Sequence, residues 1–151
     1  RETYDGKNLA ELALYPSRIY SGAVVDMLGG FNGEPKARVH GVSHITGGGV
    51  PGKLGRVLKP SGLGAYLDNP FEPCDLMKYC QEKGNVSDIE AYKTWNMGQG
   101  MIIITPNSGE VIDVANQHGI KSTVIGEITN EPTITIRNKG INSDKQKELK
   151  F

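Results

Sequence analysis

The sequence lacks a strong charge of either sign and has very few cysteines. Seventeen basic residues balance seventeen acidic ones, so no overall field attracts nucleic acid or an anionic membrane, and any anion must be bound by local groups. The two cysteines, Cys74 and Cys80, are separated on a predicted helix so that they point to different faces. We therefore expect reduced thiols and no nucleic-acid partner.

Long apolar runs are also missing. The longest are short, such as MIII at residues 101–104, whereas a transmembrane helix needs about 20 apolar residues. The first residues, RETYDGKN, have neither the basic start nor the apolar centre of a signal peptide. We expect a soluble, cytoplasmic protein with no membrane partner. Because the chain starts at Arg1 without an initiator methionine, we also expect a processed or excised piece of something longer.

What the sequence does contain is a loose alternation of strand and helix patterns on a chain of one-domain size. Hydrophobic periodicity and turn residues predict helices at 17–28 (with Ser17 as N-cap), 74–83, 87–92 and 109–118, and strands at 37–45, 62–68, 101–104, 122–128 and 133–137. Because the alternation is not strict, we predict an α/β fold of the α+β type, with a mixed β-sheet flanked by helices.

The chain is predicted to divide into three parts. Residues 1–16 form a lead-in segment, residues 17–137 form the folded domain, and residues 138–151 form a polar tail. The tail has little to bury, so we expect it to fray.

The stretch HITGGGVPGKLGR, residues 44–56, is the clearest candidate for chemistry. Three successive glycines, Gly47 to Gly49, allow neighbouring N–H groups to converge on an anion, and Lys53 and Arg56 follow closely. A glycine-rich turn that merely reverses the chain is an equal alternative. A nucleotide P-loop is excluded, because Leu54 stands where a magnesium-binding hydroxyl is needed and Pro51 has no N–H.

Two further polar positions are candidates. His44, just before the glycines, is placed to contact a ligand or donate a proton, or else to hydrogen-bond the loop backbone. His40 lies too far along the same strand to share a metal with it. Asn96 in NMGQGM either presents its amide to a ligand or caps its own turn. His118 is expected to complement a helix C-terminus at the surface.

Several segments, in order, resemble successive blocks of the C-terminal domain of the aminoimidazole ribonucleotide synthetase family, the phosphoribosylformylglycinamidine cyclo-ligases. They are GKNLAELALYPSRIY, VHGVSHITGGGVPGKLGRVLKP, GNVSDIEAYKTWNMGQGMIII and GIKSTVIGEI. H-x-T-G-G-G followed by R-V-L and later by N-M-G-x-G-M is a specific combination, and the resemblance extends from about Gly6 to Ile136.

The resemblance implies an enzyme of purine biosynthesis that uses ATP to activate the formyl oxygen of formylglycinamidine ribonucleotide. The amidine nitrogen then closes the imidazole ring of aminoimidazole ribonucleotide, with release of ADP and phosphate. It further implies that ATP and magnesium are held mainly by an N-terminal domain, which also forms a homodimer interface and of which residues 1–16 would be the connecting end. This chain would form the substrate side of the cleft and be inactive alone.

By the same resemblance, His44 is expected to be catalytic. The residues expected to bind substrate are Arg18, Thr46, Gly47, Gly48, Gly49, Asn96, Gly98 and Gly100. No metal ligand is expected in this chain.

Two alternatives remain open. Hydrogenase-maturation dehydratases, selenophosphate synthetases and thiamine-phosphate kinases share the architecture and also transfer phosphate from ATP, although they do not usually combine HITGGG with NMGQGM. A non-catalytic relative that binds a phosphorylated metabolite is the other, supported by Lys93 and Trp95, where the family usually has Arg and Phe.

Overall fold

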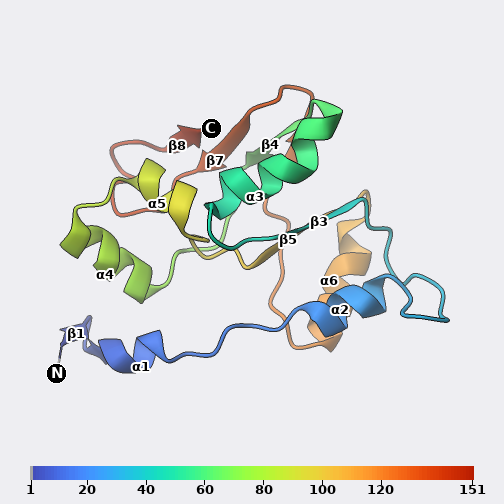
Figure 1. The fold of residues 1–151 in the computed structure, drawn as a ribbon, viewed down its shortest axis with the longest axis horizontal. Helices are drawn as coiled ribbons and strands as arrows, with labels where there is room; N and C mark the ends of the chain where they lie inside the picture. The colour runs from blue at the N-terminus through green and yellow to red at the C-terminus, as the bar shows by residue number, and fades with distance from the viewer. Residues whose placement is uncertain (1) are drawn as a thin grey trace.

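Two small sheets and an N-terminal hairpin make up the β-structure of the computed structural model, which describes residues 2–151 (Figure 1). One sheet pairs β3 (Gly41–His44) antiparallel with β5 (Met101–Ile104). The larger sheet comprises, in spatial order, β6 (Glu127–Thr129), β4 (Gly64–Leu67), β7 (Ile134–Arg137) and β8 (Glu148–Lys150). β4 and β7 are parallel and the other pairs are antiparallel. The predicted α/β class with a mixed sheet is confirmed.

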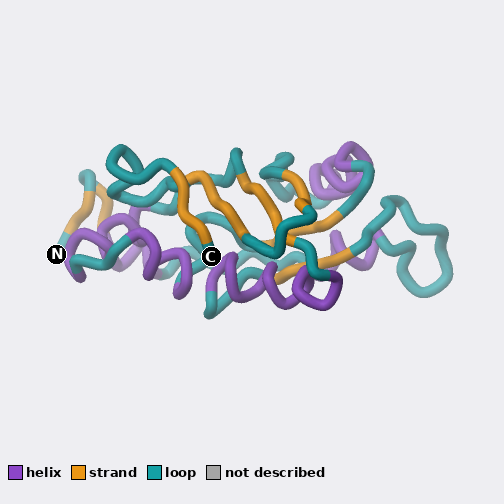
Figure 2. Tube along the Cα trace, turned by 90° about the horizontal axis from the view of Figure 1, so that it is seen from above, coloured by secondary structure: helices purple, strands orange, loops and turns teal. Residues whose placement is uncertain are grey.

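Six α-helices and one 3-10 turn are described besides these strands. They are α1 (Leu9–Ala13), α2 (Ser21–Met27), α3 (Gly49–Leu58), the 3-10 turn η1 (Lys59–Ser61), α4 (Asp75–Gly84), α5 (Asp88–Thr94) and α6 (Ser108–Gln117). Figure 2 shows the strands of the larger sheet side by side, with helices along one side of them. The predicted helices at 74–83, 87–92 and 109–118 are confirmed. Ser87 caps α5, since its hydroxyl accepts from the Glu90 N–H at 3.3 Å.

Helix α3 was missed by the sequence patterns. Its sequence, GVPGKLGRVL, contains three glycines and a proline, which are poor helix formers. The helix forms because Val50, Leu54 and Leu58 recur every fourth residue and are almost completely buried. Pro51 is tolerated because it lies in the first turn, where its missing N–H costs nothing.

Helix α2 begins later than predicted. Ser17 is not its N-cap, because the helix starts at Ser21, after Tyr20. The segment before it is extended and exposed, with Ile19 81% exposed. The predicted end is confirmed, since Gly29 and Gly30 both adopt the left-handed conformation. The predicted strand at 122–128 is largely wrong, because pairing begins only at Glu127.

The core has two parts. The larger part lies between α3, α5 and the sheets, and its buried members include Leu54, Tyr92, Met97, Ile136 and Leu149. The smaller part lies between α2 and α6, which run side by side in Figure 1, and is formed by Ala23, Met27, Ala37, Val111, Val114 and Ala115.

The prediction that residues 138–151 fray is wrong. Residues 148–150 form β8 at the edge of the larger sheet, and Leu149 is fully buried. Asn138 is also buried, and its amide donates to the Asp88 carboxylate at 2.6 Å. The apolar residues of this segment are single and widely spaced among charged residues, so no periodic pattern predicts a strand there.

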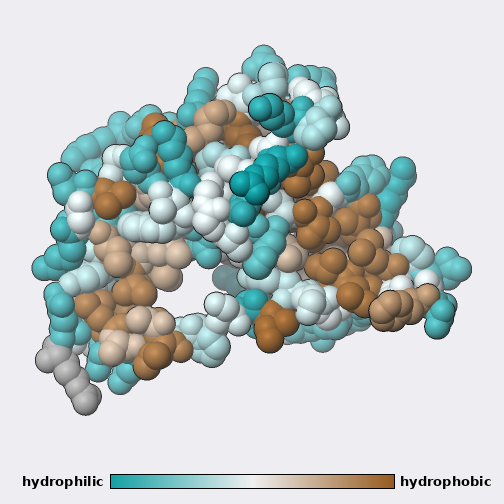
Figure 3. Space-filling model, in the orientation of Figure 1, coloured by the Kyte–Doolittle hydropathy of each residue, from teal (hydrophilic) through white to brown (hydrophobic). Residues whose placement is uncertain are grey.

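Residues 2–13 form the hairpin β1 (Thr3–Tyr4) and β2 (Lys7–Asn8) followed by α1, all docked against α4. Tyr4 donates to Glu82 at 3.0 Å, and Lys7 pairs with Asp75. The following segment, 14–19, crosses to α2 with Leu14 and Tyr15 about 80% exposed, and the space-filling view shows an open gap beside it (Figure 3). Among residues 2–151, every helix falls short of the length and apolar character that crossing a bilayer requires.

Candidate functional site

The two motif loops, far apart in the sequence, lie next to each other. His44 at the end of β3 stands opposite Met101 at the start of β5, and the Ile45 N–H donates to the Gly100 carbonyl at 2.9 Å. The strand pair therefore delivers the loop Thr46–Gly49 and the turn Asn96–Gly100 to the same edge. The sequence predicted both loops but not this pairing.

The glycine loop leads straight into α3. Gly48 is the N-cap of the helix with φ 97°, and Gly49 is its first residue with φ 59°. A Cβ at Gly49 would lie 1.8 Å from the carbonyl oxygen of Tyr92, so close packing on α5 demands a glycine there. Gly47 has neither a positive φ nor any atom within 4 Å of where its Cβ would lie. The fold does not require a glycine at 47, and the backbone there is open.

An anion would be stabilised at this point by the helix. α3 is ten residues long and carries no acidic residue in its first turn. The first N–H groups of a helix and its dipole favour negative charge at the N-terminus. Thr46 and Gly47 to Gly48 are exposed, which leaves the loop accessible. The arrangement is therefore suited to a phosphate group, and Lys53 and Arg56 lie further along the same helix.

The turn at 96–100 is shaped by its own side chains and by the segment before α4. Asn96 Oδ1 accepts from the Gly98 N–H at 3.1 Å, which is the backbone-capping alternative. Met97 is fully buried with φ 46°. Gly98 has φ 90°, and a Cβ there would lie 2.4 Å from the Glu72 carbonyl oxygen. A ligand contact by Asn96 stays a prediction.

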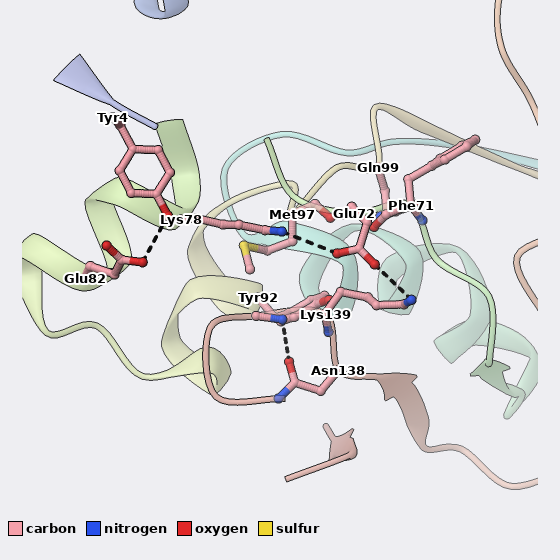
Figure 4. Close-up of polar contacts among 11 residues, drawn as sticks. Tyr4, Phe71, Glu72, Lys78, Glu82, Tyr92, Met97, Gln99, Asn138 and Lys139 are labelled. Carbon is pink, nitrogen blue, oxygen red and sulfur yellow. Dashed lines mark hydrogen bonds and ion pairs between the residues drawn. The ribbon is translucent and has the colours of Figure 1, made fainter. Parts of the chain in front are cut away.

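Gln99, which the sequence did not single out, clamps this turn. Its side chain is buried, accepts from the Phe71 N–H at 3.1 Å and donates to the carbonyl oxygens of Phe71 and Met97 at 2.9 and 2.8 Å. Figure 4 shows Gln99 beside Phe71, with Glu72 next in the chain. These three hydrogen bonds satisfy the buried amide of Gln99 and hold the turn in place.

Glu72 joins the turn to the C-terminal segment. Its carboxylate contacts Lys139 Nζ at 2.9 Å and Lys78 Nζ at 3.5 Å (Figure 4). Partial burial alone would raise the pKa of Glu72, but the two ammonium groups outweigh it and hold the pKa below its ordinary value. Lys139 belongs to the segment that the sequence predicted to fray.

Tyr92 packs against the end of the glycine loop at Gly49. It is fully buried on α5, its carbonyl oxygen packs against Gly49, and its hydroxyl accepts from the Lys139 N–H at 3.1 Å. Burial raises the pKa of Tyr92 to about 12. The periodic pattern of α5 predicts an inward tyrosine but cannot reveal its hydroxyl partner.

Not every predicted site residue lies at the glycine loop. Arg18 Nη1 donates to the Gly119 carbonyl at 3.1 Å, beyond the end of α6. Arg18, Gly98 and Gly100 instead line a largely apolar cavity of about 680 Å³ that lies between β5, α2, α6 and residues 120–128. His44 and the glycine loop do not line this cavity. The turn at 96–100 lies between them and the cavity, since Gly98 and Gly100 line it.

Two other predicted residues have ordinary structural surroundings. His118 caps the end of α6, and its Nε2 lies 3.1 Å from Asp26 on α2, so it links two helices as well as lying near a helix end. Lys93 pairs with Glu90 at 3.1 Å on the exposed face of α5. Trp95 packs partly buried against the main core.

An exposed glycine loop that opens a helix places free N–H groups and the positive end of the helix dipole where an anion could approach. The chain belongs to the family described as AIR synthase related protein, C-terminal domain, which matches residues 2–139. A phosphoribosylformylglycinamidine cyclo-ligase of Methanococcus vannielii is 42% identical over 125 residues, which make up 82% of this chain and 33% of that protein. The family resemblance predicted from the sequence is confirmed, and the chain spans about a third of the length of this curated relative.

Proposed function

We propose that this chain is the substrate-side domain of an ATP-dependent cyclo-ligase of purine biosynthesis. The whole protein would close formylglycinamidine ribonucleotide to aminoimidazole ribonucleotide, with release of ADP and phosphate. The observation that carries the proposal is that β3 and β5 bring the H-x-T-G-G-G loop and the N-x-G-x-G turn to one edge, in a chain similar to a named cyclo-ligase. The proposed localisation is cytoplasmic, and the proposed assembly is a homodimer.

In this proposal, residues at different positions along the edge bind the phosphate, transfer a proton and orient the ligand. The N–H groups of Gly47 and Gly48, at the start of α3, bind a phosphate oxygen of the ribonucleotide or of the activated formyl group. His44, exposed at the end of β3, accepts the proton that the amidine nitrogen loses as it bonds to the formyl carbon, or donates a proton to the formyl oxygen that leaves as phosphate. Thr46 and Asn96 border the same edge and orient the ligand.

ATP and magnesium are assigned to another part of the protein. Among residues 2–151, no three His, Cys, Asp or Glu side chains come together in a way that would hold a metal ion. We assign no step to the metal within this chain. ATP would supply the phosphoryl group that activates the formyl oxygen when bound by the N-terminal domain.

The test is a turnover assay of the full-length protein with ATP, magnesium and formylglycinamidine ribonucleotide. We expect ADP release that depends on the ribonucleotide, together with aminoimidazole ribonucleotide as product. The isolated 151-residue chain serves as the control and is expected to give no turnover. ADP release with thiamine phosphate or selenide instead, or binding of the ribonucleotide without turnover, would contradict the proposal and support one of the two alternatives.

A further inference from the structure

Tyr20 lies where three separate segments of the chain meet. It directly precedes α2, and its ring stands edge-on to the imidazole of His44, with 6.1 Å between the centroids and 65° between the planes. Its hydroxyl lies over the backbone of Gly100, because a Cβ at that position would be 1.8 Å from Tyr20 Oη. Tyr20 thus contacts both the catalytic candidate on β3 and the turn before β5.

The contact with Tyr20 explains why residue 100 is a glycine. The φ of Gly100 is not positive, so its backbone conformation does not require one. The space that a side chain would occupy is taken by the phenol of Tyr20. Tyr20 and Gly100 therefore form a matched pair that holds the phenol hydroxyl at the rim of the turn.

The hydroxyl held there has no protein partner. Throughout residues 2–151, no hydrogen bond joins Tyr20 Oη to another group. Tyrosine hydroxyls in partly buried positions usually find a partner. Tyr20 is partly buried and lines the cavity into which Arg18 also projects. A hydroxyl without a protein partner among residues 2–151 therefore lies beside the His44 imidazole and the turn at Gly100.

We propose that Tyr20 is a further substrate-binding residue, whose hydroxyl hydrogen-bonds an oxygen of the phosphorylated ribosyl substrate beside His44. The inference rests on the proposed function for the identity of that substrate. It gives Tyr20, two residues after Arg18, a direct contact with the ligand. The ring of Tyr20 packs edge-on against His44. A phenylalanine at this position keeps that packing and removes only the hydroxyl, so it tests the hydrogen bond to the ligand by itself.

The experiment compares Tyr20→Phe with wild type in the full-length protein. We expect the KM for formylglycinamidine ribonucleotide to rise roughly 5- to 10-fold, as for the loss of one hydrogen bond, with the melting temperature and the His44 imidazole NMR signals unchanged. Tyr15→Phe is the matched control, because Tyr15 precedes the same helix but is 79% exposed, and it is expected to behave as wild type. An unchanged KM in Tyr20→Phe overturns the proposal.

A second probe separates this proposal from the proposed function. Ribose 5-phosphate is titrated into wild type and Tyr20→Phe, with His44 imidazole shifts as the readout. If wild type shows no turnover, the proposed function fails, but a weaker Kd of the variant for this probe still supports Tyr20 as a ligand contact. An equal Kd in both proteins, or no binding to wild type, overturns the role of Tyr20.

Discussion

At the scale of single residues, the glycines of the two motifs have different reasons to be glycine. Gly49 and Gly98 are required by close backbone contacts, with Tyr92 and Glu72 respectively, and Gly100 by the phenol of Tyr20. Gly47 has no such requirement, and a ligand contact at its open backbone stays a prediction beside the alternative of a plain glycine-rich turn. The sequence could predict the loops from their glycine content, but these distinctions depend on tertiary neighbours that no local pattern encodes.

Gly47→Ala is therefore expected to fold normally and to bind substrate poorly. An added methyl group has free space in the protein. If a phosphate binds the loop as proposed, the methyl group would hinder its approach to the backbone, and we expect kcat/KM of the full-length protein to fall about tenfold or more. Gly49→Ala, by contrast, meets the Tyr92 carbonyl and should lower the free energy of unfolding by about 3 kcal/mol or more. Steady-state kinetics and thermal melts measure both effects.

Gly55→Ala is the control for these variants, because its new methyl group would make an ordinary contact with Ile134 at 3.6 Å. It should keep wild-type kinetics and melt at the same or a higher temperature. If Gly47→Ala shows wild-type kcat/KM, the open backbone at Gly47 does not bind the ligand.

Tyr92→Phe tests the support beneath the loop. Removing the hydroxyl leaves the Lys139 N–H without its acceptor and should cost about 1–3 kcal/mol of stability at neutral pH. Because burial raises the pKa of Tyr92 from 10.0 to about 12, its stabilising contribution is complete below pH 10 and is lost as the pH rises toward 12. The difference in stability between wild type and variant should therefore shrink over that interval in denaturant titrations. A difference that stays constant up to pH 12 would show that Tyr92 does not titrate as described.

At the scale of elements, periodicity predicted α4, α5, α6 and most of α2, whereas α3 and β8 depend on packing. α3 exists despite its glycines because its buried face fills the core, and β8 exists because Leu149 completes the sheet. Local propensity could not anticipate either, since both depend on contacts with distant segments. The pairing of β3 with β5 is the same kind of contact, and it brings the two motif loops to one edge.

The link between α2 and α6 is expected to depend on pH. Asp26 contacts Lys36 at 2.6 Å and His118 at 3.1 Å, and hydrogen bonds from Lys36 and then His118 lower the pKa of the Asp26 carboxyl. Its contribution is complete above the unfolded-state pKa of about 3.9 and is lost as the pH falls through the lower folded-state pKa. Asp26→Asn should thus lower the melting temperature slightly near neutral pH. Melts repeated below the folded-state pKa should show no difference, and a difference that persists there would contradict the role of the charge.

The attachment of the C-terminal segment is expected to depend on Asp88. Its buried carboxylate accepts from Gln81 at 2.8 Å, from Asn138 at 2.6 Å and from the Asn142 N–H at 3.1 Å. Asp88→Ala leaves these donors unsatisfied and should destabilise the protein by about 3 kcal/mol. Hydrogen exchange of the β8 amides should accelerate in the variant, whereas the exposed Asp144→Ala serves as a control without effect. Unchanged exchange in Asp88→Ala would show that another contact holds β8.

At the scale of the whole molecule, the chain is one domain of a family whose curated relative is about three times longer than the matched region. The sequence blocks identified the family because each is a specific combination of residues and the blocks follow one another in the same order as in the family. They could not show that Tyr20, Gln99 and Tyr92 support the site, because each acts through a partner distant in sequence. Because the matched region covers 33% of that relative, the proposed activity is tested in the full-length protein.

The most direct test of the central claim is the turnover of formylglycinamidine ribonucleotide by full-length His44→Gln. His44 is exposed at the end of β3, so the substitution should leave the melting temperature unchanged. If the edge formed by the glycine loop and the turn at 96–100 is the reaction site, kcat should fall by about 100-fold or more, as for loss of a general acid or base. Near-normal turnover in this variant would contradict the account.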